Sequence, residues 1–599
     1  MSESMGNWRR SCLAGDVTEA MVGEELILMG WCHKQRDLGG LLFITLRDIA
    51  GEVQIVVDDD SPLDVQKKAA GVRGEYVLAV KGNLRLRSAV NPDMKTGTVE
   101  LHAQDLRILS ESETPPFYIE EDIDVNENLR LKYRFLDLRR PGMQQKLLAR
   151  HRITKITRDF FDREGFIDVE TPTLIKSTPE GARDYLVPSR VFPGRFFALP
   201  QSPQLYKQLL MLAGYNKYMQ IARCFRDEDL RADRQPEFTQ IDIEMAFVGE
   251  EDVLDVNERF LQTLMREFCD FELTLPIRRI TWRDAMARFG SDKPDLRFGM
   301  EIADLSDLAQ KTDFQVFKNA IDEGGIVAAI AVPGGASMSR RELDGLSSFM
   351  KQNTKAKGLS WLSLGEDGES KGSVAKFCDA SFVKEALRRA NAAEDAQLLI
   401  GADADRMTAL ESLGDLRIEV AKRRDLIPKG RFEFCWVTEF PLLEWSEETE
   451  RYVAKHHPFT SPMEEDIEML DTNPGEVRAR AYDMVLNGTE LGGGSIRIHR
   501  QDLQKRMFKL LGFTEEQAEE QFGFLMSAFR FGVPPHGGLA YGLDRIVMLL
   551  VGEESIREVI AFPKVQNSSS VMTGAPYYVA QKQLDELGLA IAKKDPDEA

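Results

Sequence analysis

Five strand-like segments near the N-terminus constrain the fold of this chain more than any other sequence feature. Apolar residues cluster there, or alternate with polar ones, in residues 26–29, 41–44, 53–56, 76–87 and 99–103. Glycine and asparagine residues, which favour turns, punctuate this region. Five strands in under about 90 residues predict a small closed β-barrel, of which the oligonucleotide-binding (OB) fold is a common case. A small β domain with no role in nucleic-acid binding would show the same pattern.

The remaining segments indicate further domains, as the length of 599 residues also does. Prolines and an acidic run mark residues 111–140 as a connector. Residues 143–164 have apolar side chains at helical spacing, which predicts a helix that ends at Gly165. Strands and helices then mix without the regular βαβ rhythm of a parallel sheet, which favours an antiparallel sheet with helices. The glycine-rich residues 290–425 indicate an α/β module inserted into this larger domain.

Composition and cysteine usage narrow the class of protein. Hydrophobic residues make up 43% of the chain and charged residues 29%, as in globular domains. No window reaches the run of about 18 apolar residues that a membrane helix needs, and residues 1–15 lack the apolar core of a secretory signal. The six cysteines form no CxxC pair, which indicates reduced thiols and gives no zinc-site spacing. We therefore expect a cytoplasmic protein with no membrane partner.

The net charge of −21 argues against bulk, non-specific binding of nucleic acid. Proteins that bind nucleic acid mainly by neutralising phosphates are usually basic. A local basic stretch on one face is still compatible with an acidic total. Residues 33–36, His-Lys-Gln-Arg, form such a stretch within the predicted barrel.

Three segments concentrate charged and polar residues in surroundings that indicate order. The first places Arg226, Asp227, Glu228 and Gln235 between two apolar strands. An arginine at a strand end can hold a phosphate through paired hydrogen bonds, and acidic neighbours can bind an amine or a magnesium ion. A solvated hairpin tip with salt bridges would have the same composition.

The other two segments combine glycines with charged residues. Asp483 and Glu490 stand on either side of a turn, and such hard oxygen ligands suit Mg²⁺ on a nucleotide. The three glycines at 492–494 allow a close approach of a ligand, although a β-bulge without a ligand would also use them. In the third segment Arg545 falls in the first turn of an apolar helix, as it also would in a simple packing turn. No P-loop or GxGxxG loop is present, so ATP would have to be held in another way.

Together these segments resemble the class II aminoacyl-tRNA synthetases and, within that class, the bacterial-type aspartyl-tRNA synthetase family. The long helix with residues 165–172 is similar to motif 1, a dimer element in the family. The Arg226-Asp227-Glu228 loop is similar to motif 2, and residues 542–545 are similar to motif 3. Residues 177–185, 201–208 and 456–460 match aspartate-specific words of the family. The resemblance covers roughly residues 15–580.

This resemblance implies a multidomain protein. It combines an N-terminal OB-fold barrel with an α+β catalytic domain built on an antiparallel sheet, and adds an inserted α/β module. The implied domains are an anticodon-binding domain at 1–112, a hinge at 113–140, a first catalytic part with motifs 1 and 2 at 141–289, a bacterial-type insertion at 290–425, and a second catalytic part with motif 3 and a C-terminal extension at 426–599.

The implied activity is ligation of L-aspartate to the 3′ end of tRNA(Asp), with ATP as the activating substrate. In the family, Arg497 and Lys207 would grip the side-chain carboxylate. A fork donor and a point charge suit that group, and neutral asparagine would leave the cations unpaired. The aspartate-binding residues implied by the resemblance are Glu180, Ser202, Gln204, Lys207, Arg226, Asp242, His456 and Arg497.

The resemblance also assigns the nucleotide and metal sites. Arg226 and Arg545 would be catalytic, while Asp483 and Glu490 would hold Mg²⁺. Phe238 would stack on the adenine, and catalysis would consist mostly of positioning and charge neutralisation. The ATP-binding residues implied are Arg226, Asp227, Glu228, Gln235, Phe238, Glu490, Gly542, Leu543, Asp544 and Arg545.

The barrel would read the tRNA anticodon through Arg36, Phe43 and Gln54, because an aromatic ring can stack a splayed base while Arg and Gln read its edges. Leu38 bears on tRNA specificity: forms of the enzyme that also aspartylate tRNA(Asn) often carry histidine there, and leucine favours strict use of tRNA(Asp). Charging of tRNA(Asn) as well stays the alternative. A homodimer is implied by motif 1.

Three other readings of the sequence lead to different proteins. Asparaginyl- and lysyl-tRNA synthetases share the fold, but the Glu180 loop and the inserted module argue against both. A non-catalytic relative would have lost Arg226, Glu490, Arg497 or Arg545, and all four are present. An asparagine synthetase on the same catalytic fold would not need the N-terminal barrel or the connector.

Overall fold

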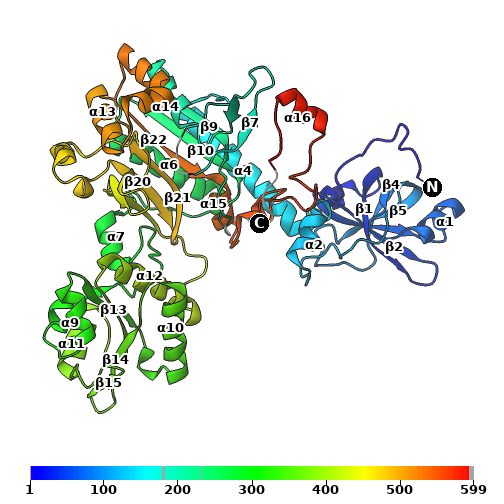
Figure 1. Ribbon diagram of the computed structural model, residues 1–599. Helices are drawn as coiled ribbons and strands as arrows, with labels where there is room; N and C mark the ends of the chain where they lie inside the picture. Colours follow the sequence, from blue (N-terminus) through cyan, green and yellow to red (C-terminus); the bar gives the residue numbers. More distant parts are fainter. Residues whose placement is uncertain (1, 179–181, 231–232, 593–599) are drawn as a thin grey trace. The chain divides into compact units, whose positions relative to one another are not determined.

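The computed structural model describes residues 2–178, 182–230 and 233–592, and the chain forms two compact units (Figure 1). The first unit consists of Met1–Thr154, Asp229–Pro236 and Val547–Gln581. The second consists of Lys155–Glu228, Glu237–Ile546 and Lys582–Ala599. Within the described ranges, every helix is too short or too polar to cross a membrane.

The first unit contains the predicted barrel, drawn in blue in Figure 1. Its strands are β1 (Glu25–Asp37), β2 (Leu42–Asp48), β3 (Gly51–Val57), β4 (Val77–Leu86) and β5 (Val99–Ser110). They close in the order β1-β2-β3-β5-β4, and only the β3–β5 pair is parallel. Alternate side chains such as Leu28, Ile44 and Leu101 point inward and are fully buried, as the alternating pattern requires. The helix α1 (Leu63–Gly71) follows β3. The prediction of a small closed barrel is confirmed.

The connector of the first unit is held by a buried arginine. Arg134 is 1% exposed and forms an ion pair of 2.6 Å with Asp137. Its other donors bind the main-chain oxygens of Arg557, Ile560 and Ala561 at 2.9–3.0 Å. A fully hydrogen-bonded buried guanidinium fixes the segments that it joins. The elements here are α2 (Glu127–Lys132), α3 (Arg134–Asp137), the start of α4 (Pro141–Arg163) and the 3₁₀ turn η7 (Ile556–Val559).

The second unit is organised around an eight-stranded sheet of order β11-β17-β20-β21-β22-β10-β9-β6. Its central pairs are antiparallel, and only the outermost pairs, β11–β17 and β6–β9, are parallel. This confirms the predicted antiparallel sheet. The strands are β6 (Ile167–Asp168), β9 (Lys217–Phe225), β10 (Glu237–Ala246), β11 (Arg279–Thr281), β17 (Phe434–Thr438), β20 (Ala481–Leu486), β21 (Thr489–Ile496) and β22 (His536–Gly542).

Helices cover the sheet with apolar faces. Phe260 of α6 contacts Tyr541 of β22, with 5.7 Å between the ring centroids, and packs on Phe160 and Phe161 of α4. Aromatic side chains bury large areas and so fix helices on a sheet. The helices are α5 (Gln204–Leu212), α6 (Glu250–Cys269), α7 (Trp282–Phe289), α13 (Gln501–Leu510), α14 (Glu515–Ala528) and α15 (Leu543–Leu550).

The inserted module, green in Figure 1, is a five-stranded antiparallel sheet between two helical layers. All seven residues of β13 are buried because helices cover both of its faces. The module's strands are β12 (Ala303–Asp304), β13 (Ile326–Val332), β14 (Ser360–Leu364), β15 (Ser370–Gly372) and β16 (Gln397–Asp403). Its helices are α8 (Ser306–Ala309), α9 (Gln315–Asp322), α10 (Arg340–Asn353), α11 (Ala380–Arg389) and α12 (Arg406–Arg423).

Short elements complete the chain. They are the hairpins β7 (Leu186–Pro188) with β8 (Phe196–Ala198) and β18 (Leu443–Ser446) with β19 (Arg451–Ala454), the 3₁₀ turns η1 (Ala14–Asp16), η2 (Glu19–Met21), η3 (Gly335–Ser337), η4 (Glu464–Asp471), η5 (Pro474–Glu476) and η6 (Phe529–Phe531), and the C-terminal helix α16 (Gln581–Leu587).

Candidate active site

A buried charged cluster lies on one face of the central sheet of the second unit. Asp242 and Glu244 share a face of β10 because they stand two residues apart. Lys207 of α5 binds both of them, with its Nζ 2.9 Å from Asp242 Oδ1 and 3.2 Å from Glu244 Oε2. Arg497, directly after β21, donates from Nε and Nη2 to the two oxygens of Glu244 at 2.9 and 3.1 Å. Two cations therefore meet two carboxylates in a site that is almost closed to water.

The surroundings set the ionisation of the two carboxyls in opposite directions. Burial raises the pKa of Asp242 to about 6, against the pull of Lys207. Burial alone would raise the pKa of Glu244 too, but the charges of Arg497 and Lys207 outweigh it and lower the pKa to about 2. Glu244 is therefore the fixed counter-ion of the cluster, and Asp242 is the carboxyl that can change its charge.

Arg497 has a second set of partners on its Nη1 side. Nη1 donates to Ser495 Oγ at 2.6 Å and lies 2.7 Å from His457 Nε2. The main-chain nitrogen of Phe459 lies 3.1 Å from His457 Nδ1. Burial and Arg497 hold the pKa of His457 well below its usual value, so the ring is neutral. Because an arginine can only donate, Nε2 of this ring is the acceptor in the 2.7 Å contact with Arg497 Nη1, and His457 helps to fix the orientation of the guanidinium.

A hydrogen-bonded chain supports the cluster from α5. Gln204 Nε2 donates to Gln208 Oε1 at 3.2 Å, and Gln208 Nε2 lies 3.1 Å from His536 Nε2. His536 Nδ1 lies 2.8 Å from the carbonyl oxygen of Pro534, which can only accept. Nε2 of this histidine must therefore be the acceptor for Gln208. The chain fixes the orientation of the polar face of α5 beside Lys207.

Asp483 and Glu490 come together through a β-bulge. The β20–β21 register pairs Met484 with Gly492 but Val485 with Glu490, so Leu491 is the extra residue. The shift places Glu490 on the same face as Asp483. Gly493 lies directly opposite Asp483, and a Cβ added to Gly493 would come within 2.3 Å of Asp483 Oδ1. The structure therefore has the bulge that the sequence offered as one alternative, and Gly493 makes room there for the Asp483 carboxylate.

The two carboxylates fit a magnesium ion that shares a nucleotide. Within the described ranges, no group of three or more His, Cys, Asp or Glu side chains is arranged to bind a metal alone. Mg²⁺ is commonly bound by one or two carboxylates together with substrate phosphates and water. Burial and the neighbouring Glu490 raise the pKa of Asp483, as expected for a carboxylate pair that needs a cation. His456 Nε2 lies 3.9 Å from Asp483 Oδ1, and burial lowers its pKa to about 4.

The residues predicted to bind the nucleotide also lie close together, directly after β9, on β10 and at the start of α15. The Arg226 guanidinium lies over the Phe238 ring, 5.1 Å from its centroid. Arg226 Nε is buried and has no hydrogen-bond partner among the described residues, so it is a donor available to a ligand. Asp544 accepts the main-chain N–H of Thr239 at 2.9 Å and so joins α15 to β10. Arg545 Nη1 donates to the main-chain oxygen of Glu490 at 3.1 Å.

Other predicted site residues form hydrogen bonds with the main chain or lie away from the charged cluster. Gln235, in the first unit, uses its carboxamide on the main chain of Lys564, accepting at 2.7 Å and donating at 3.1 Å. Asp227 pairs with Arg183 in an isolated β-bridge, and Ser202 Oγ accepts from the N–H of Gln204 at 3.4 Å. The remaining predicted residues are Glu228 before the segment 229–236, Gly542 at the end of β22, Leu543 buried in α15, and Glu180, which lies outside the described residues.

Sequence reasoning missed Glu244, Ser495, His457 and His536. The alternation of Asp242 and Glu244 along one strand was the available signal, because it places both on one face. The roles of the other three depend on which strands become neighbours, and no local pattern reports that.

The predicted nucleic-acid residues lie on the outer face of the barrel. Arg36 stands opposite Phe43 on β2, and Gln54 of β3 stands opposite Thr45, two residues further along β2. These side chains therefore share one face. Gln54 Nε2 donates to Glu100 Oε2 at 2.8 Å. Leu38 is 67% exposed in the turn between β1 and β2, next to two glycines with positive φ.

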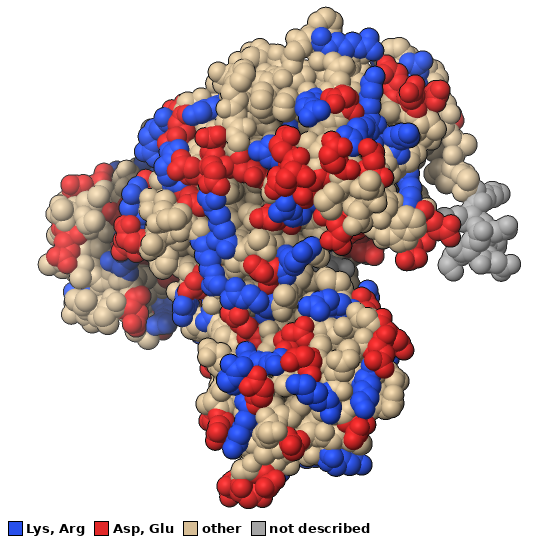
Figure 2. All heavy atoms as spheres, turned by 90° about the vertical axis from the view of Figure 1, so that its left-hand side faces the viewer, with Lys and Arg blue, Asp and Glu red and all other residues tan. Residues whose placement is uncertain are grey.

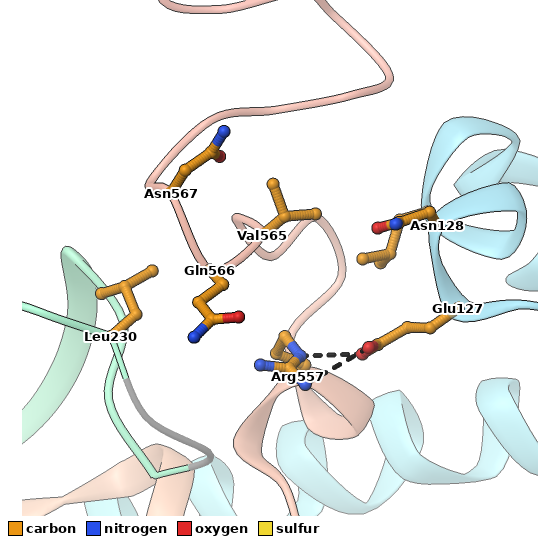
Figure 3. Close-up of a pocket in the computed structure, with 8 residues that line it drawn as sticks. Glu127, Asn128, Leu230, Arg557, Val565, Gln566 and Asn567 are labelled. Atoms are coloured by element: carbon orange, nitrogen blue, oxygen red, sulfur yellow. Dashed lines mark hydrogen bonds and ion pairs between the residues drawn. The ribbon is translucent and has the colours of Figure 1, made fainter. Parts of the chain in front are cut away.

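A pocket of about 560 Å³ in the first unit is lined by none of the predicted residues (Figure 3). Leu230 and Val565 supply apolar contacts, and Gln566 and Asn567 supply amides. Arg557 Nε donates to Glu127 Oε1 at 2.8 Å at its edge. The pocket lacks the buried cations of the charged cluster, so the chemistry favours the cluster as the active site.

Charges on the face that Figure 2 shows are interleaved. Blue Lys and Arg side chains alternate there with red Asp and Glu side chains, and neither sign gathers into one broad patch among the residues described on this face. On this face the interleaved charges of the described residues form no broad basic surface of the kind that binds nucleic acid mainly by charge.

Comparison with known families matches nearly the whole chain. The model for "tRNA synthetases class II (D, K and N)" matches residues 126–566, and that for "OB-fold nucleic acid binding domain" matches residues 26–109. The aspartate–tRNA(Asp/Asn) ligase of Caldanaerobacter subterraneus subsp. tengcongensis is 56% identical over 593 residues, which cover 99% of this chain and 100% of that protein. The aspartate–tRNA ligase of Ruminiclostridium cellulolyticum is also 56% identical, with 99% and 100% covered.

Solved structures share the fold at low sequence identity. A putative aspartyl-tRNA synthetase from Leishmania major has a TM-score of 0.59 at 18% identity, covering 94% of this chain and 96% of that one. The asparaginyl-tRNA synthetase of Pyrococcus horikoshii complexed with asparaginyl-adenylate has a TM-score of 0.58 at 17% identity, with 93% and 98% covered.

Proposed function

This chain belongs to the class II tRNA synthetases of the D, K and N group, and from that premise we propose that it is an aspartate–tRNA ligase. The observation that carries the proposal is that Arg497 and Lys207 come together in a buried site, where both contact Glu244. Two cations gathered there suit a ligand that brings a side-chain carboxylate. Relatives that are 56% identical along nearly the whole chain carry the name of this activity.

Aspartate binds with its side-chain carboxylate at Arg497 and Lys207. The fixed orientation of Arg497, which bonds to Glu244, Ser495 and His457, supports this placement. Asp242 carries the complementary role, because a carboxylate beside Lys207 can meet the α-ammonium group once ionised. Ser202, Gln204, His456 and Glu180 complete the proposed aspartate site. Asparagine is rejected because its neutral amide forms weaker hydrogen bonds with Arg497 and Lys207 than a carboxylate does, and its NH2 group would face donors.

Activation joins the aspartate α-carboxylate to the α-phosphorus of ATP. The carboxylate oxygen forms the new P–O bond while pyrophosphate leaves, so the product is aspartyl-adenylate. Arg226 holds the reacting groups through its unpaired buried Nε, and Phe238 stacks on the adenine. Arg545 binds the terminal phosphate, and Asp227, Glu228, Gly542, Leu543 and Asp544 shape the remainder of the nucleotide site. Positioning and charge neutralisation supply the catalysis.

Asp483 and Glu490 are the residues that would hold magnesium. When bound, Mg²⁺ would neutralise the charge of the departing pyrophosphate. In the second reaction step, the 3′-terminal hydroxyl of the tRNA attacks the activated carbonyl carbon and AMP leaves.

The barrel binds the anticodon of tRNA(Asp) through Arg36, Phe43 and Gln54. Their shared outer face supports this role, since an exposed aromatic ring with adjacent polar groups can stack and read single-stranded bases. Leu38 favours strict use of tRNA(Asp). Charging of tRNA(Asn) is the second candidate, because one relative at 56% identity is named for both tRNAs.

The protein works as a cytoplasmic homodimer. Apolar side chains exposed around motif 1 support the dimer, among them Leu148, Ile167 and Leu174 at 45–50% exposure. The six cysteines are all free, which supports a reducing compartment. Sedimentation of the purified protein tests the dimer.

Charging of tRNA transcripts with labelled aspartate tests the function. We expect charging of tRNA(Asp) with ATP and Mg²⁺, and no charging of tRNA(Asn). Comparable charging of both would establish the alternative, and charging of neither would overturn the proposal. Arg226→Ala should lose about 3–5 kcal/mol of transition-state stabilisation in ATP–pyrophosphate exchange, judged from other preorganised donors.

A further inference from the structure

The segment that leads into the inserted module passes beside the Asp483–Glu490 pair. Lys293 Nζ lies 3.8 Å from Glu490 Oε2 and 2.9 Å from Asp292 Oδ1. The amine of Lys293 thus stands between two carboxylates, a position that suits its ordinary charged form. The roles proposed above for the nucleotide site do not include this lysine.

The backbone around Lys293 is fixed by a buried arginine. Arg417 of α12 is 1% exposed and donates from Nη2 to the main-chain oxygens of Asp295, Phe298 and Gly299 at 2.8–2.9 Å. Its guanidinium also lies 4.1 Å from the centroid of the Phe298 ring. A buried guanidinium that donates to three main-chain carbonyl groups restrains the chain that carries them. The module therefore holds this segment in place.

The same segment lies directly on the hairpin that carries the metal-binding carboxylates. Gly488, in the β20–β21 turn, has a φ of +81°, and a Cβ added there would come within 3.2 Å of Asp295 Cβ. Asp295 is 3% exposed and forms an ion pair of 2.6 Å with Arg297. The contact between Gly488 and Asp295 and the hydrogen bonds of Arg417 together hold Lys293 close to Glu490. The position of Lys293 is thus set by the surrounding structure.

The charges show why a cation is needed at this place. Asp483, Glu490 and Asp292 bring three carboxylates together, and Arg545 Nη1 lies 3.9 Å from Glu490 Oε2. Without a divalent cation, Lys293 and Arg545 are the cations beside Glu490 among the described residues. A bound triphosphate would add further negative charge beside Lys293 and Arg545, and its oxygens would compete with the carboxylates for these cations.

We infer that Lys293 is a further residue of the nucleotide site, supplied by the inserted module. In the free protein it neutralises the Asp483–Glu490 pair and competes with a divalent cation. When the nucleotide binds with its metal, the amine transfers to the oxygens of the triphosphate. This inference rests on the proposed function and gives the start of the inserted module a role in ATP binding.

Two binding measurements on the full-length protein test the inference. The first is titration with Mn²⁺ without nucleotide, followed by the electron paramagnetic resonance of the free ion, with Asp483→Asn identifying the site. The second is calorimetric titration with ATP at saturating Mg²⁺. Lys293→Gln should bind Mn²⁺ about threefold more tightly, because a repelling charge is removed. It should bind ATP about tenfold more weakly, because a charge-assisted hydrogen bond is lost.

Tighter binding of Mn²⁺ together with weaker binding of ATP distinguishes this role from a structural defect, because a structural defect would weaken the binding of both. Lys293→Arg should keep the ATP affinity of the wild type. Lys318→Gln is the matched control, because Lys318 is 36% exposed against 38% for Lys293 and also pairs with one aspartate, at 3.2 Å. An unchanged ATP affinity in Lys293→Gln, or a weakening of both interactions, overturns the inference. If the wild type charges tRNA(Asp) in either case, the proposed function still stands.

Discussion

The charged cluster of the eight-stranded sheet and the outer face of the barrel differ in how deeply their polar side chains are buried and in how their charges are paired. Lys207, Asp242 and Glu244 are at most 1% exposed, and their charges are paired before a ligand arrives. On the barrel, Arg36 is exposed and Phe43 is half-buried. Under the proposed function, the cluster is a preformed site for aspartate, whereas the barrel offers an open surface for the flexible anticodon loop.

The difference shows where electrostatic interactions are strong. Coulomb interactions gain strength in a site closed to water and are screened at an exposed surface. Loss of one charge in the cluster leaves its partner buried and uncompensated, while loss of a side chain on the barrel face removes only contacts with the ligand. Substitutions should therefore affect stability and catalysis together in the first region, and tRNA binding alone in the second.

The largest effect should come from Arg497→Leu. Glu244 would lose its bidentate partner, so we expect unfolding to become easier by about 3–5 kcal/mol and aspartate activation to be lost. Thermal unfolding and pyrophosphate exchange measure the two effects. Arg500→Leu is the control, since Arg500 is 47% exposed and pairs with Asp502 on the surface. Equal effects of both substitutions would contradict the contrast between the two regions.

Gly538→Ala should come next. A Cβ at this position would lie 2.1 Å from Glu244 Oε2 and 2.1 Å from the main-chain oxygen of Ile243. Overpacking of this kind should destabilise the protein by about 2–3 kcal/mol and raise the KM for aspartate by displacing Glu244. Gly71→Ala, where the added carbon meets nothing within 4 Å, should leave both quantities near the wild-type values. A wild-type KM in Gly538→Ala would show that Glu244 does not set the aspartate site.

Phe43→Ala tests the barrel side of the comparison. Loss of a stacked base should lower kcat/KM for tRNA charging by the equivalent of about 1–3 kcal/mol. Pyrophosphate exchange without tRNA should be unchanged, because the ring has no part in activation. Leu63→Ala, at an apolar residue on α1 that is 73% exposed, is the control. A fall in the exchange rate of Phe43→Ala would show that the two regions are not independent.

The smallest effect concerns pH and Asp242. Its folded-state pKa is raised to about 6, so the carboxyl is protonated below that pH and cannot bind an ammonium group. The KM for aspartate should rise about tenfold one pH unit below this pKa. In stability, the raised pKa favours the folded state at low pH, and this contribution is lost as the pH rises through about 6. Asp242→Asn should flatten both profiles, and a persisting inflection would assign it to another group.

Local patterns were sufficient to predict the main elements. The spacing of apolar residues in 143–164 predicted the helix that the structure has as Pro141–Arg163. Alternation in residues 25–110 predicted the five barrel strands. Both signals are periodic because a strand alternates its side chains and a helix repeats about every 3.6 residues. The motifs then indicated, through their resemblance to a family, which residues should form the aspartate, nucleotide and anticodon sites.

Local patterns could not predict which strands pair when they lie far apart in the sequence. Glu244 meets Arg497 because β10 and β21 lie on either side of β22, and the sequence separation of 253 residues leaves no periodic trace. His457 reaches Arg497 from a loop, and Gly493 makes room for Asp483 from the facing strand. Each of these contacts depends on register and on neighbouring strands.

The sequence by itself determined the elements, the barrel and the family, because these follow from local periodicity and from ordered motifs. Only the tertiary structure decided which charges neutralise one another, how the bulge at Leu491 aligns Asp483 with Glu490, and that Lys293 lies beside this pair. The physical reason is that burial and Coulomb interaction act through space. Their strength depends on distance and on the exclusion of water, and both are set when strands far apart in the chain become neighbours.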